Sequence, residues 1–590
     1  MAMGLARFRA DPGSKRREGP LIGAGDRYLL AADISIHDRS GIARRLSLQS
    51  VDSAGREDAQ LLLAAWERWE EDCLSWLNAD FAFALWDRDR QELVLSRDFL
   101  GNRPLFYHRS SDGIAVASMP AGLLALPHIP CRPNREALSK FVAIAPPEGP
   151  EWFFEGVKRV MPGQVLRLST NGERASTHWQ PKRKVLELLR PDDYVDAVQE
   201  ALDRAVANRL VPGVATGCHL SAGLDSGAVM ASIAVQLPAD ERLSAFTAAA
   251  PDGFEAPEPS FRLYDEAPLA AEAVERYANV DHVILRSEGS DVTAIWDKAF
   301  WLFQAPLPNA CNFLWVGAIN DAAQARGVRR MMSATLGNTS FSYTPPTHLA
   351  NLLTSGRLLT VARELRASHH LGASFPNLLR GTLRPLMPIQ MLKAIAARGG
   401  RPTSSAGMHF GSDKSVGLSD ANILGIYPRD GWEERVGGIS LVDLGVYLKG
   451  MLAGWGIDEC DPTADKDLFE LCLSIPDDIY HRNGQSRALA RAMLADRLPE
   501  SVLAERRRGY QSPDWRQSVH AGLTALRSEN ARARHSVESS RLLNLDGIDD
   551  ALNNIGSDLR PGQADEILIR RGVLRGLAGA HFIRKATGQN

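Results

Sequence analysis

Short apolar runs separated by polar turns fill the first 180 residues of the chain. Residues 81–86 and 92–96 are two such runs, and the charged stretch 87–90 between them predicts a β-hairpin. Residues 59–69 predict a helix. Two more hairpins are predicted from runs 105–107 and 114–117 around 110–113, and from 163–168 and 175–179 around Asn171-Gly172. We therefore expect an α+β domain rich in short strands over residues 1–180.

The period of the apolar positions changes after Pro191, where Asp192 and Asp193 predict a helix cap. Apolar side chains then recur at helical spacing, at Tyr194, Val195, Val198, Leu202 and Val206. Further along, strands predicted at 243–249 and 281–285 flank a helix predicted over 265–277. Strands that alternate with helices indicate an α/β domain with a parallel sheet covered on both faces, which binds ligands at the carboxyl ends of its strands.

Residues 219–231 join a predicted strand to a predicted helix through a tight turn of small residues. Ser221, Ala222 and Gly223 let the backbone approach a ligand closely, and the helix that follows directs N–H groups at an anion. Asp225 would repel a phosphate unless a divalent cation lay between them, so the pattern indicates a metal-bound pyrophosphate. The alternative is an ordinary strand-to-helix turn with a capping Asp or Ser.

Composition narrows the class of protein. A chain of 590 residues exceeds one hydrophobic core, and 44% hydrophobic with 24% charged residues is ordinary for a soluble globular protein. The net charge of −3 gives no argument for nucleic acid or a membrane surface as a partner. Six scattered cysteines without CxxC spacing fit reduced thiols, and no run of about 18 apolar residues occurs. We expect a cytoplasmic protein.

The segment Ser221-Ala222-Gly223-Leu224-Asp225-Ser226 resembles the pyrophosphate loop of the asparagine synthetase family of ATP pyrophosphatases. The resemblance implies an ATP-pyrophosphatase domain over residues 190–590, with a largely helical C-terminal part. It also implies ATP and Mg²⁺ as cofactors, with Asp225 as metal ligand and catalytic residue. Enzymes of this family cleave ATP between the α and β phosphates, adenylate a carboxylate and pass the acyl group to an amine.

Residues 81–87, Arg97-Asp98 and 101–107 resemble the glutaminase-like (Ntn-type, N-terminal nucleophile) domain of the same family. In glutamine-using members a cysteine follows the initiator Met, whereas this chain begins Met1-Ala2-Met3-Gly4. The segment 33–38 also lacks the Gly-Glu pair that holds glutamine. We therefore expect a degenerate domain over residues 1–180 without glutaminase activity, in which Cys73 and Cys131 pack as small apolar residues.

Two further parts of the nucleotide site follow from the resemblance. Phe246 and Thr247 are expected beside the adenine, although they could be core residues only. A strand at 328–333 leads to Gly337 and Asn338, and Asn338 stands where the family has its second magnesium-binding Asp. An amide oxygen can ligate Mg²⁺ without contributing charge.

Arginines complete the expected site. Arg487 and Arg491 are four residues apart, so we expect them on one helix face, where they could grip phosphate or a peptide carboxylate or simply be solvated. Arg507 or Arg508 stands where the family has a lysine that neutralises charge during acyl transfer, and alignment does not decide between them. A solvated basic run is the alternative for these two.

The segments Gly-Asn-Thr-Ser-Phe-Ser (337–342) and Arg-Gly-Tyr-Gln (508–511) look most like those of proteobacterial lasso peptide cyclases. This resemblance implies adenylation of a side-chain carboxylate of a precursor peptide, followed by attack of its N-terminal amine to close a macrolactam ring through an isopeptide bond. The implied partners are the precursor core peptide, a maturation protease and a leader-binding protein. The alternatives are an ammonia-dependent asparagine synthetase, a β-lactam synthetase-like enzyme and a non-catalytic peptide-binding scaffold.

Residues 345–455 suggest no function. Helices are expected over 352–365 and 441–452, and the polar stretch 399–419 is expected to form a mobile loop.

Overall fold

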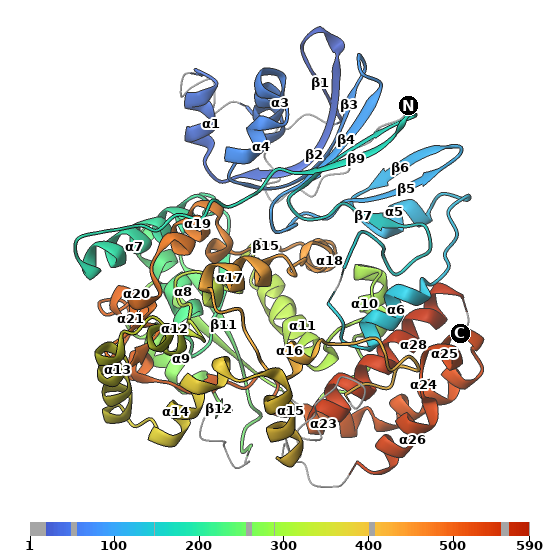
Figure 1. Ribbon diagram of the computed structural model, residues 1–590. Coiled ribbons are helices and arrows are strands. Elements are labelled where there is room, and N and C mark those ends of the chain that lie inside the picture. The colour runs from blue at the N-terminus through green and yellow to red at the C-terminus, as the bar shows by residue number, and fades with distance from the viewer. Residues whose placement is uncertain are drawn as a thin grey trace.

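The computed structural model describes residues 19–48, 56–146, 148–254, 262–287, 289–399, 408–555 and 566–588. The chain begins in an antiparallel, strand-rich part and continues into a larger part built on a parallel sheet and many helices (Figure 1). The start of the chain at Met1–Gly4 and residues 400–407 of the predicted loop lie outside the described residues.

Antiparallel pairing organises the N-terminal part, as the alternating pattern predicts. Its six-stranded sheet has the order β1-β2-β3-β4-β8-β9, and a second sheet has the order β6-β5-β7. All three predicted hairpins and the predicted helix α3 are confirmed. The bounds are β1 Leu21–Ile22, β2 Tyr28–Ile36, α3 Asp58–Trp69, β3 Ala79–Asp87, β4 Glu92–Arg97, β5 Phe106–Ser110, β6 Gly113–Ala117, β7 Lys158–Arg159, β8 Gln164–Ser169 and β9 Gly172–Thr177.

The first helix of the larger part, α7 (Pro191–Ala207), begins differently from the prediction. Arg190 is its N-cap, and Pro191 takes the first helical position, which Pro favours because its fixed φ suits a helix. Asp193 lies in the first turn and accepts a hydrogen bond from the Arg190 backbone N–H at 3.0 Å. The acidic pair therefore supports the cap from inside the helix.

A five-stranded parallel sheet with the order β13-β11-β10-β14-β15 forms the centre of this part. The chain passes from β10 outward to β11 and β13, then returns to the other side of β10 as β14. The loops after β10 and β14 therefore diverge at a topological switch point, where open α/β sheets bind ligands. The bounds are β10 Thr216–His219, β11 Leu243–Ala249, β13 Val280–Arg286, β14 Arg330–Met332 and β15 Asp458–Cys460.

Both faces of the sheet are buried. Phe246 and Met331 pack into one hydrophobic cluster, whereas their neighbours Ala245 and Met332 pack into another. Successive side chains of a strand point to opposite faces, so the two clusters cover opposite sides of the sheet. The predicted covered parallel sheet is confirmed.

The remaining chain is largely helical. Two helices, α12 (His348–Thr354) and α13 (Leu358–His370), replace the single helix expected over 352–365, because Gly356 between them has a positive φ of 76°. The helix expected over 441–452 is α18 (Gly445–Trp455). Part of the predicted loop is packed instead, since Met408 and Phe410 are buried and Asn544 N–H donates to the Phe410 carbonyl at 2.7 Å.

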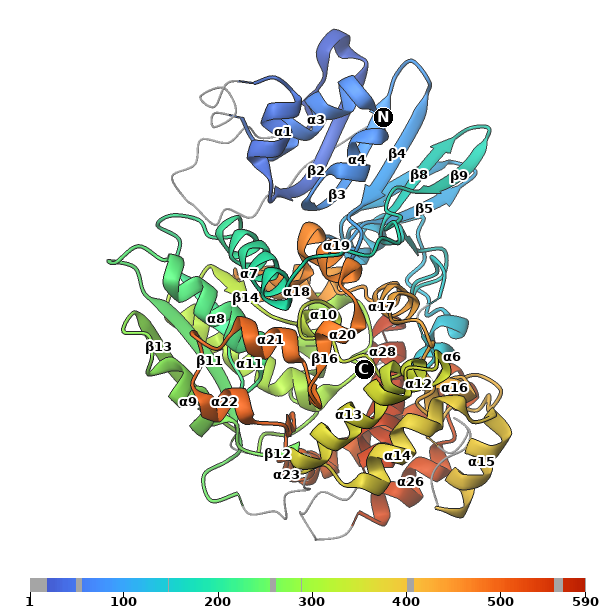
Figure 2. The same cartoon turned by 60° about the vertical axis from the view of Figure 1, so that its left-hand side comes forward.

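Buried ion pairs join the two parts where α18 and α19 (Lys466–Ser474) lie beneath the N-terminal sheet (Figures 1 and 2). The Arg103 guanidinium bonds the Asp458 carboxylate of β15 at 2.9 Å, and Arg97 bonds Asp443 at 2.7 Å. Lys449 of α18 donates to Asp33 of β2 at 2.7 Å. These three contacts form only when both parts are in place, although Asp458 also has Arg330 of β14 as a partner.

Candidate active site

The Ser221–Gly223 turn leaves β10 at the switch point and is held by hydrogen bonds of its own. Ser221 N–H donates to the Ser226 hydroxyl at 3.0 Å, and Gly223 N–H donates to the Ser221 hydroxyl at 3.1 Å. Ala222 N–H donates to the Glu266 carboxylate at 3.1 Å. The N–H groups of these three turn residues therefore already have partners in this structure.

The helix after the turn, α8 (Leu224–Gln236), provides other donors. Gly223 is its N-cap and offers no side-chain cap, so the first-turn amides and the positive end of the helix dipole remain for an anion. Leu224 is buried in the hydrophobic core, so it can contribute to ligand binding only through its backbone.

Asp225 points from the first turn of α8 against the turn that follows β14. A Cβ atom built on Gly337 would lie 2.5 Å from Asp225 Cγ, so only glycine leaves room for the carboxylate. Asp225 Oδ1 is buried and has no hydrogen-bond partner in the described part of the chain. Burial raises the pKa of this carboxyl, while the nearby Arg487 lowers it. An unpaired, buried carboxylate oxygen fits a ligand of a hard divalent cation.

Asn338 follows Gly337 in the short 3₁₀ turn η2 (Gly337–Thr339). Its Oδ1 accepts a hydrogen bond from the Arg487 guanidinium. The amide oxygen predicted to ligate Mg²⁺ thus lies beside the switch point, but it faces an arginine here. Its role as a metal ligand stays a prediction, and no group of three or more His, Cys, Asp or Glu in the described ranges could hold a metal.

The expectation that Arg487 and Arg491 share one helix face is wrong. Arg487 is the N-cap of α21 (Ala488–Met493), with a left-handed backbone (φ 54°, ψ 33°), so it precedes the helix that carries Arg491. The backbone N–H of Arg491 donates to the Arg487 carbonyl at 3.0 Å, and burial and then Arg487 are the largest causes that lower the pKa of Arg491. Spacing predicted their proximity, but not the backbone that produces it.

Further guanidinium groups join this pair. Arg506 contributes to the lowered pKa of Arg491, and Arg508 contributes to that of Arg487, after the larger effect of burial. Arg491 Nη1 is buried without a hydrogen-bond partner in the described structure. Like charges brought together and partly desolvated are costly unless an anion neutralises them. The cluster therefore has the chemistry of a phosphate or carboxylate site.

The two candidates for the family lysine have different surroundings. Arg507 lies against Glu505, to which its Nη2 donates at 2.7 Å, and the pKa of that carboxyl falls to about 2, mainly through this hydrogen bond. Arg508 is exposed, and after the larger effect of burial it contributes to the lowered pKa of Arg487. Which of the two takes the place of the family lysine stays a prediction.

Glu266 is a site residue that the sequence did not reveal. Besides Ala222, it contacts the Arg508 segment, since a Cβ atom on Gly509 would lie 2.2 Å from its Oε2. The cause is a parallel pairing of β12 (Arg262–Leu263) with β18 (Arg508–Gly509), two segments far apart in sequence. Burial raises the pKa of Glu266. Its carboxyl group thus ties the loop to the arginine segment.

Phe246 and Thr247, predicted beside adenine, are both buried. Phe246 packs in the core, its carbonyl accepts from Leu220 N–H at 2.8 Å, and the Thr247 hydroxyl lies 2.8 Å from His282 Nε2. Their contact with a nucleotide stays a prediction.

The two cysteines of the N-terminal part differ. Cys73 is buried as expected, and desolvation raises the pKa of its thiol to about 12, which makes it a poor nucleophile. Cys131 is exposed, so the expectation that it packs as an apolar residue is wrong.

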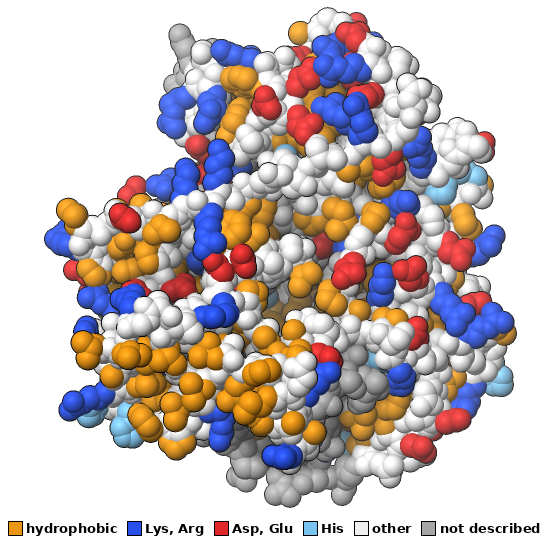
Figure 3. Space-filling model, viewed as in Figure 1, with side chains coloured by type: hydrophobic (Ala, Val, Ile, Leu, Met, Phe, Trp, Pro, Cys, Tyr) orange, Lys and Arg blue, Asp and Glu red, His pale blue; other side chains and the backbone are white. Residues whose placement is uncertain are grey.

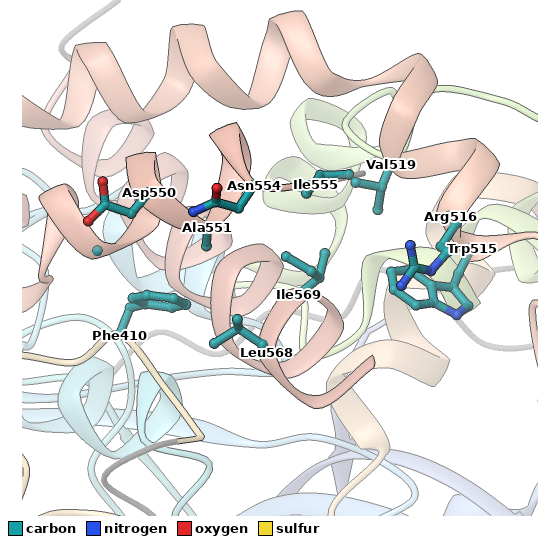
Figure 4. Close-up of a pocket in the computed structure, with 11 residues that line it drawn as sticks. Phe410, Trp515, Arg516, Val519, Asp550, Ala551, Asn554, Ile555, Leu568 and Ile569 are labelled. Carbon is teal, nitrogen blue, oxygen red and sulfur yellow. The ribbon is translucent and has the colours of Figure 1, made fainter. Parts of the chain in front are cut away.

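A cavity of about 330 Å³ lies elsewhere, among the C-terminal helices, lined by Phe410, Trp515 and Arg516 among others (Figure 4). None of the predicted site residues lines it.

In the part of the chain that can be described, no helix is both long and apolar enough to cross a lipid bilayer.

The chain has an antiparallel α+β part followed by a parallel sheet. The site is a strand, a loop and a helix at the switch point of that sheet, which is typical of nucleotide-binding α/β proteins. The chain belongs to the asparagine synthase family, which it matches over residues 197–564. Residues 2–179 match the glutamine amidotransferase domain.

Several named proteins are similar in sequence to this chain. Asparagine synthetase [glutamine-hydrolyzing] 3 of Bacillus subtilis (strain 168) is 31% identical over 35% of this chain and 34% of its own. Amidase chry2 of Gibberella zeae is 26% identical over 47% of this chain and 42% of its own. The chain thus spans less than half the length of these two relatives. Asparagine synthetase [glutamine-hydrolyzing] 1 of B. subtilis is 22% identical over 84% of this chain and 77% of its own.

A solved structure of glutamine phosphoribosylpyrophosphate amidotransferase from B. subtilis, complexed with ADP and GMP, resembles 38% of this chain and 56% of that one. Its TM-score is 0.19 and its sequence identity 12%.

Proposed function

We propose that this chain is an ATP-dependent carbon–nitrogen ligase that forms AMP and closes a lasso peptide by an isopeptide bond. The observation that carries the proposal is the buried Asp225 Oδ1 without a hydrogen-bond partner among the described residues, at the start of α8, with Arg487 bonded to Asn338 beside it. Family membership supports amide bond formation. The resemblance of 337–342 and 508–511 to lasso cyclases supports the peptide as substrate.

The chemistry has two steps. An oxygen of the side-chain carboxylate attacks the α-phosphorus of ATP, and pyrophosphate leaves toward the α8 N-terminus and the arginines. The neutral N-terminal amine then attacks the acyl carbon, and the bond between that carbon and the AMP oxygen breaks. AMP leaves with the bonding electron pair, and the nitrogen releases one proton to solvent as the amide forms. Because acid and amine belong to one chain, positioning supplies much of the rate.

Individual residues have distinct proposed roles. Asp225 would hold Mg²⁺, through the Oδ1 atom that is buried without a partner, together with phosphate oxygens. When bound, Mg²⁺ neutralises phosphate charge during displacement. Arg487 and Arg491 neutralise the departing pyrophosphate, and Arg508 stabilises charge that develops on the acyl group. The precursor peptide, a maturation protease and a leader-binding protein are the proposed partners, and the cytoplasm is the proposed location.

The test is incubation of the purified protein with Mg·ATP and a leader-freed core peptide. We expect AMP and pyrophosphate in equal amounts, and a peptide product lighter by one water. Asp225→Ala is expected to abolish all three, and undiminished activity in that variant would contradict the proposal.

An ammonia-dependent asparagine synthetase is the second candidate, because two of the named relatives are asparagine synthetases, although their names give glutamine hydrolysis as the source of nitrogen. Free aspartate with ammonia and Mg·ATP would then yield asparagine, without any need for a peptide. A failure to bind ATP under any condition would instead favour a non-catalytic peptide-binding scaffold.

A further inference from the structure

One surface of the molecule combines exposed apolar side chains with positive charge. It is formed by α13, α14 (Phe375–Leu383) and α15 (Ile389–Arg398), which we call the α13–α15 face. In Figure 3 hydrophobic side chains gather over the region where Figure 1 places α13 and α14. Its exposed large apolar residues are Leu358, Leu359, Leu371, Phe375, Leu379, Met391 and Ile395.

These helices bury little of their own apolar surface. The only buried residue of α14 is Thr382, whereas Phe375 and Leu379 are 49% and 43% exposed. On α15, Met391 and Ile395 are 50% and 49% exposed. Residues four apart lie on one side of a helix, so each helix presents an apolar stripe to solvent. Apolar patches of this kind mark interaction sites more often than isolated exposed residues do.

Charge limits what can cover this face. Residues 345–399 contain seven Arg or Lys and one acidic residue, Glu364, although the whole chain has 68 basic and 71 acidic residues. Glu364 is buried, while Arg363, Arg366 and Arg380 are exposed. A second copy of the same face would bring like charges together, which disfavours self-association. The occupant must be apolar and acidic.

The α13–α15 face is attached to the arginine cluster. Glu364 of α13 accepts hydrogen bonds from the backbone N–H groups of Asn483 at 3.2 Å and Gly484 at 2.7 Å. Gly484 packs so closely that a Cβ atom there would lie 2.2 Å from Ser368 N. Arg506 also donates to the Leu371 carbonyl.

This attachment favours a polypeptide as the occupant. Arg487, three residues after Gly484, contacts Asn338 at the switch point. The segment from Asn483 to Arg487 thus connects α13 to the rim of the candidate active site. A lipid surface would gain nothing from that continuity.

We propose that the α13–α15 face docks an amphipathic segment of a partner polypeptide, whose apolar stripe packs on the exposed apolar side chains of α14 and α15 and whose Asp or Glu side chains meet the exposed arginines. This inference goes beyond the proposed function, because docking requires neither ATP nor bond formation. Failure of the ligase assay would leave it intact.

The test uses the full chain and a fluorescein-labelled helical peptide of about 18 residues, with Leu on one side and Glu on the other. A matched peptide carries Lys in place of Glu. By fluorescence anisotropy at low salt, we expect the Glu peptide to bind at least about tenfold more tightly than the Lys peptide, and to weaken as salt rises. Equal binding of the two peptides, or no binding of the Glu peptide, would overturn the proposal.

Two variants locate the docking surface. Phe375→Ser and Arg380→Glu are both at exposed positions, and each is expected to weaken the Glu peptide by about fivefold or more with an unchanged Tm. The control Val537→Ser removes an exposed apolar side chain from α25 (Val537–Leu542) and is expected to bind as wild type. If both variants bind normally, the surface is wrongly assigned. If they lose sedimentation with phosphatidylglycerol vesicles but keep the peptide, a lipid surface replaces the polypeptide.

Discussion

Gly337→Ala tests whether the contact between η2 and Asp225 shapes the nucleotide site. The added Cβ would lie 2.5 Å from Asp225 Cγ and Oδ1, although carbon atoms in contact prefer about 3.5–4.0 Å. The carboxylate must therefore rotate or the turn must move. Overpacking of this kind costs about 1–3 kcal/mol. If the displaced carboxylate bears the cost, affinity for Mg·ATP falls roughly 5- to 150-fold.

The assay is titration calorimetry with Mg·ATP, together with the Tm of the free protein. Gly437→Ala is the matched control, because it lies in α17 (Gly431–Ile439) and a Cβ there has no neighbour within 4 Å. We expect this control to bind as wild type and to gain up to about 1 kcal/mol in stability. Wild-type affinity and Tm in Gly337→Ala would refute the reasoning.

Three further outcomes follow from the structure. Glu266→Ala removes the acceptor of the Ala222 N–H and should lower the unfolding free energy by about 1–3 kcal/mol. Glu266→Gln keeps an acceptor and should cost less, and equal losses of the two variants in denaturant titrations would contradict this. Arg508→Ala should lower the rate of AMP release by about tenfold or more, and Arg507→Ala by less, since Arg507 is held by a carboxylate; the reverse order would assign the family lysine to Arg507. Burial lowers the pKa of His37 to about 4, below its usual 6.5, so the unfolded state takes up the proton first as pH falls. The stability that this group contributes above about pH 6.5, about 3 kcal/mol, is therefore lost as pH falls toward 4. His37→Gln should flatten that part of the stability curve, and parallel curves would show that His37 does not contribute.

Local patterns in the sequence predicted the fold well wherever local chemistry decides structure. The N-terminal hairpins follow from the alternation of apolar and polar residues and from the turn residues between them. The position of the Ser221 loop follows from the order of predicted strands and helices around it. The break at Gly356 was missed because apolar spacing continues across it, although the glycine was visible in the sequence.

Contacts between distant segments could not be predicted. Glu266 reaches the loop because β12 pairs with β18, and the sequence of each two-residue strand is too short to predict its pairing with the other. Arg487 acquires its left-handed backbone at the end of a short hairpin formed by β16 (His481–Arg482) and β17 (Gln485–Ser486). Spacing identified the arginines, but only tertiary structure shows which of them converge.

The ion pairs at the junction bear on how this chain could have evolved. Asp458 lies on β15, the last strand of the parallel sheet. Burial raises the pKa of its carboxyl, but Arg103 and Arg330 outweigh burial and lower that pKa to about 2. Loss of the N-terminal part would remove Arg103 and would leave the Asp443 carboxylate without Arg97 and Arg159. Both carboxylates would then face water with fewer cationic partners. The two parts of this chain are therefore matched in charge at their junction, and a substitution on one side of it calls for a compensating one on the other.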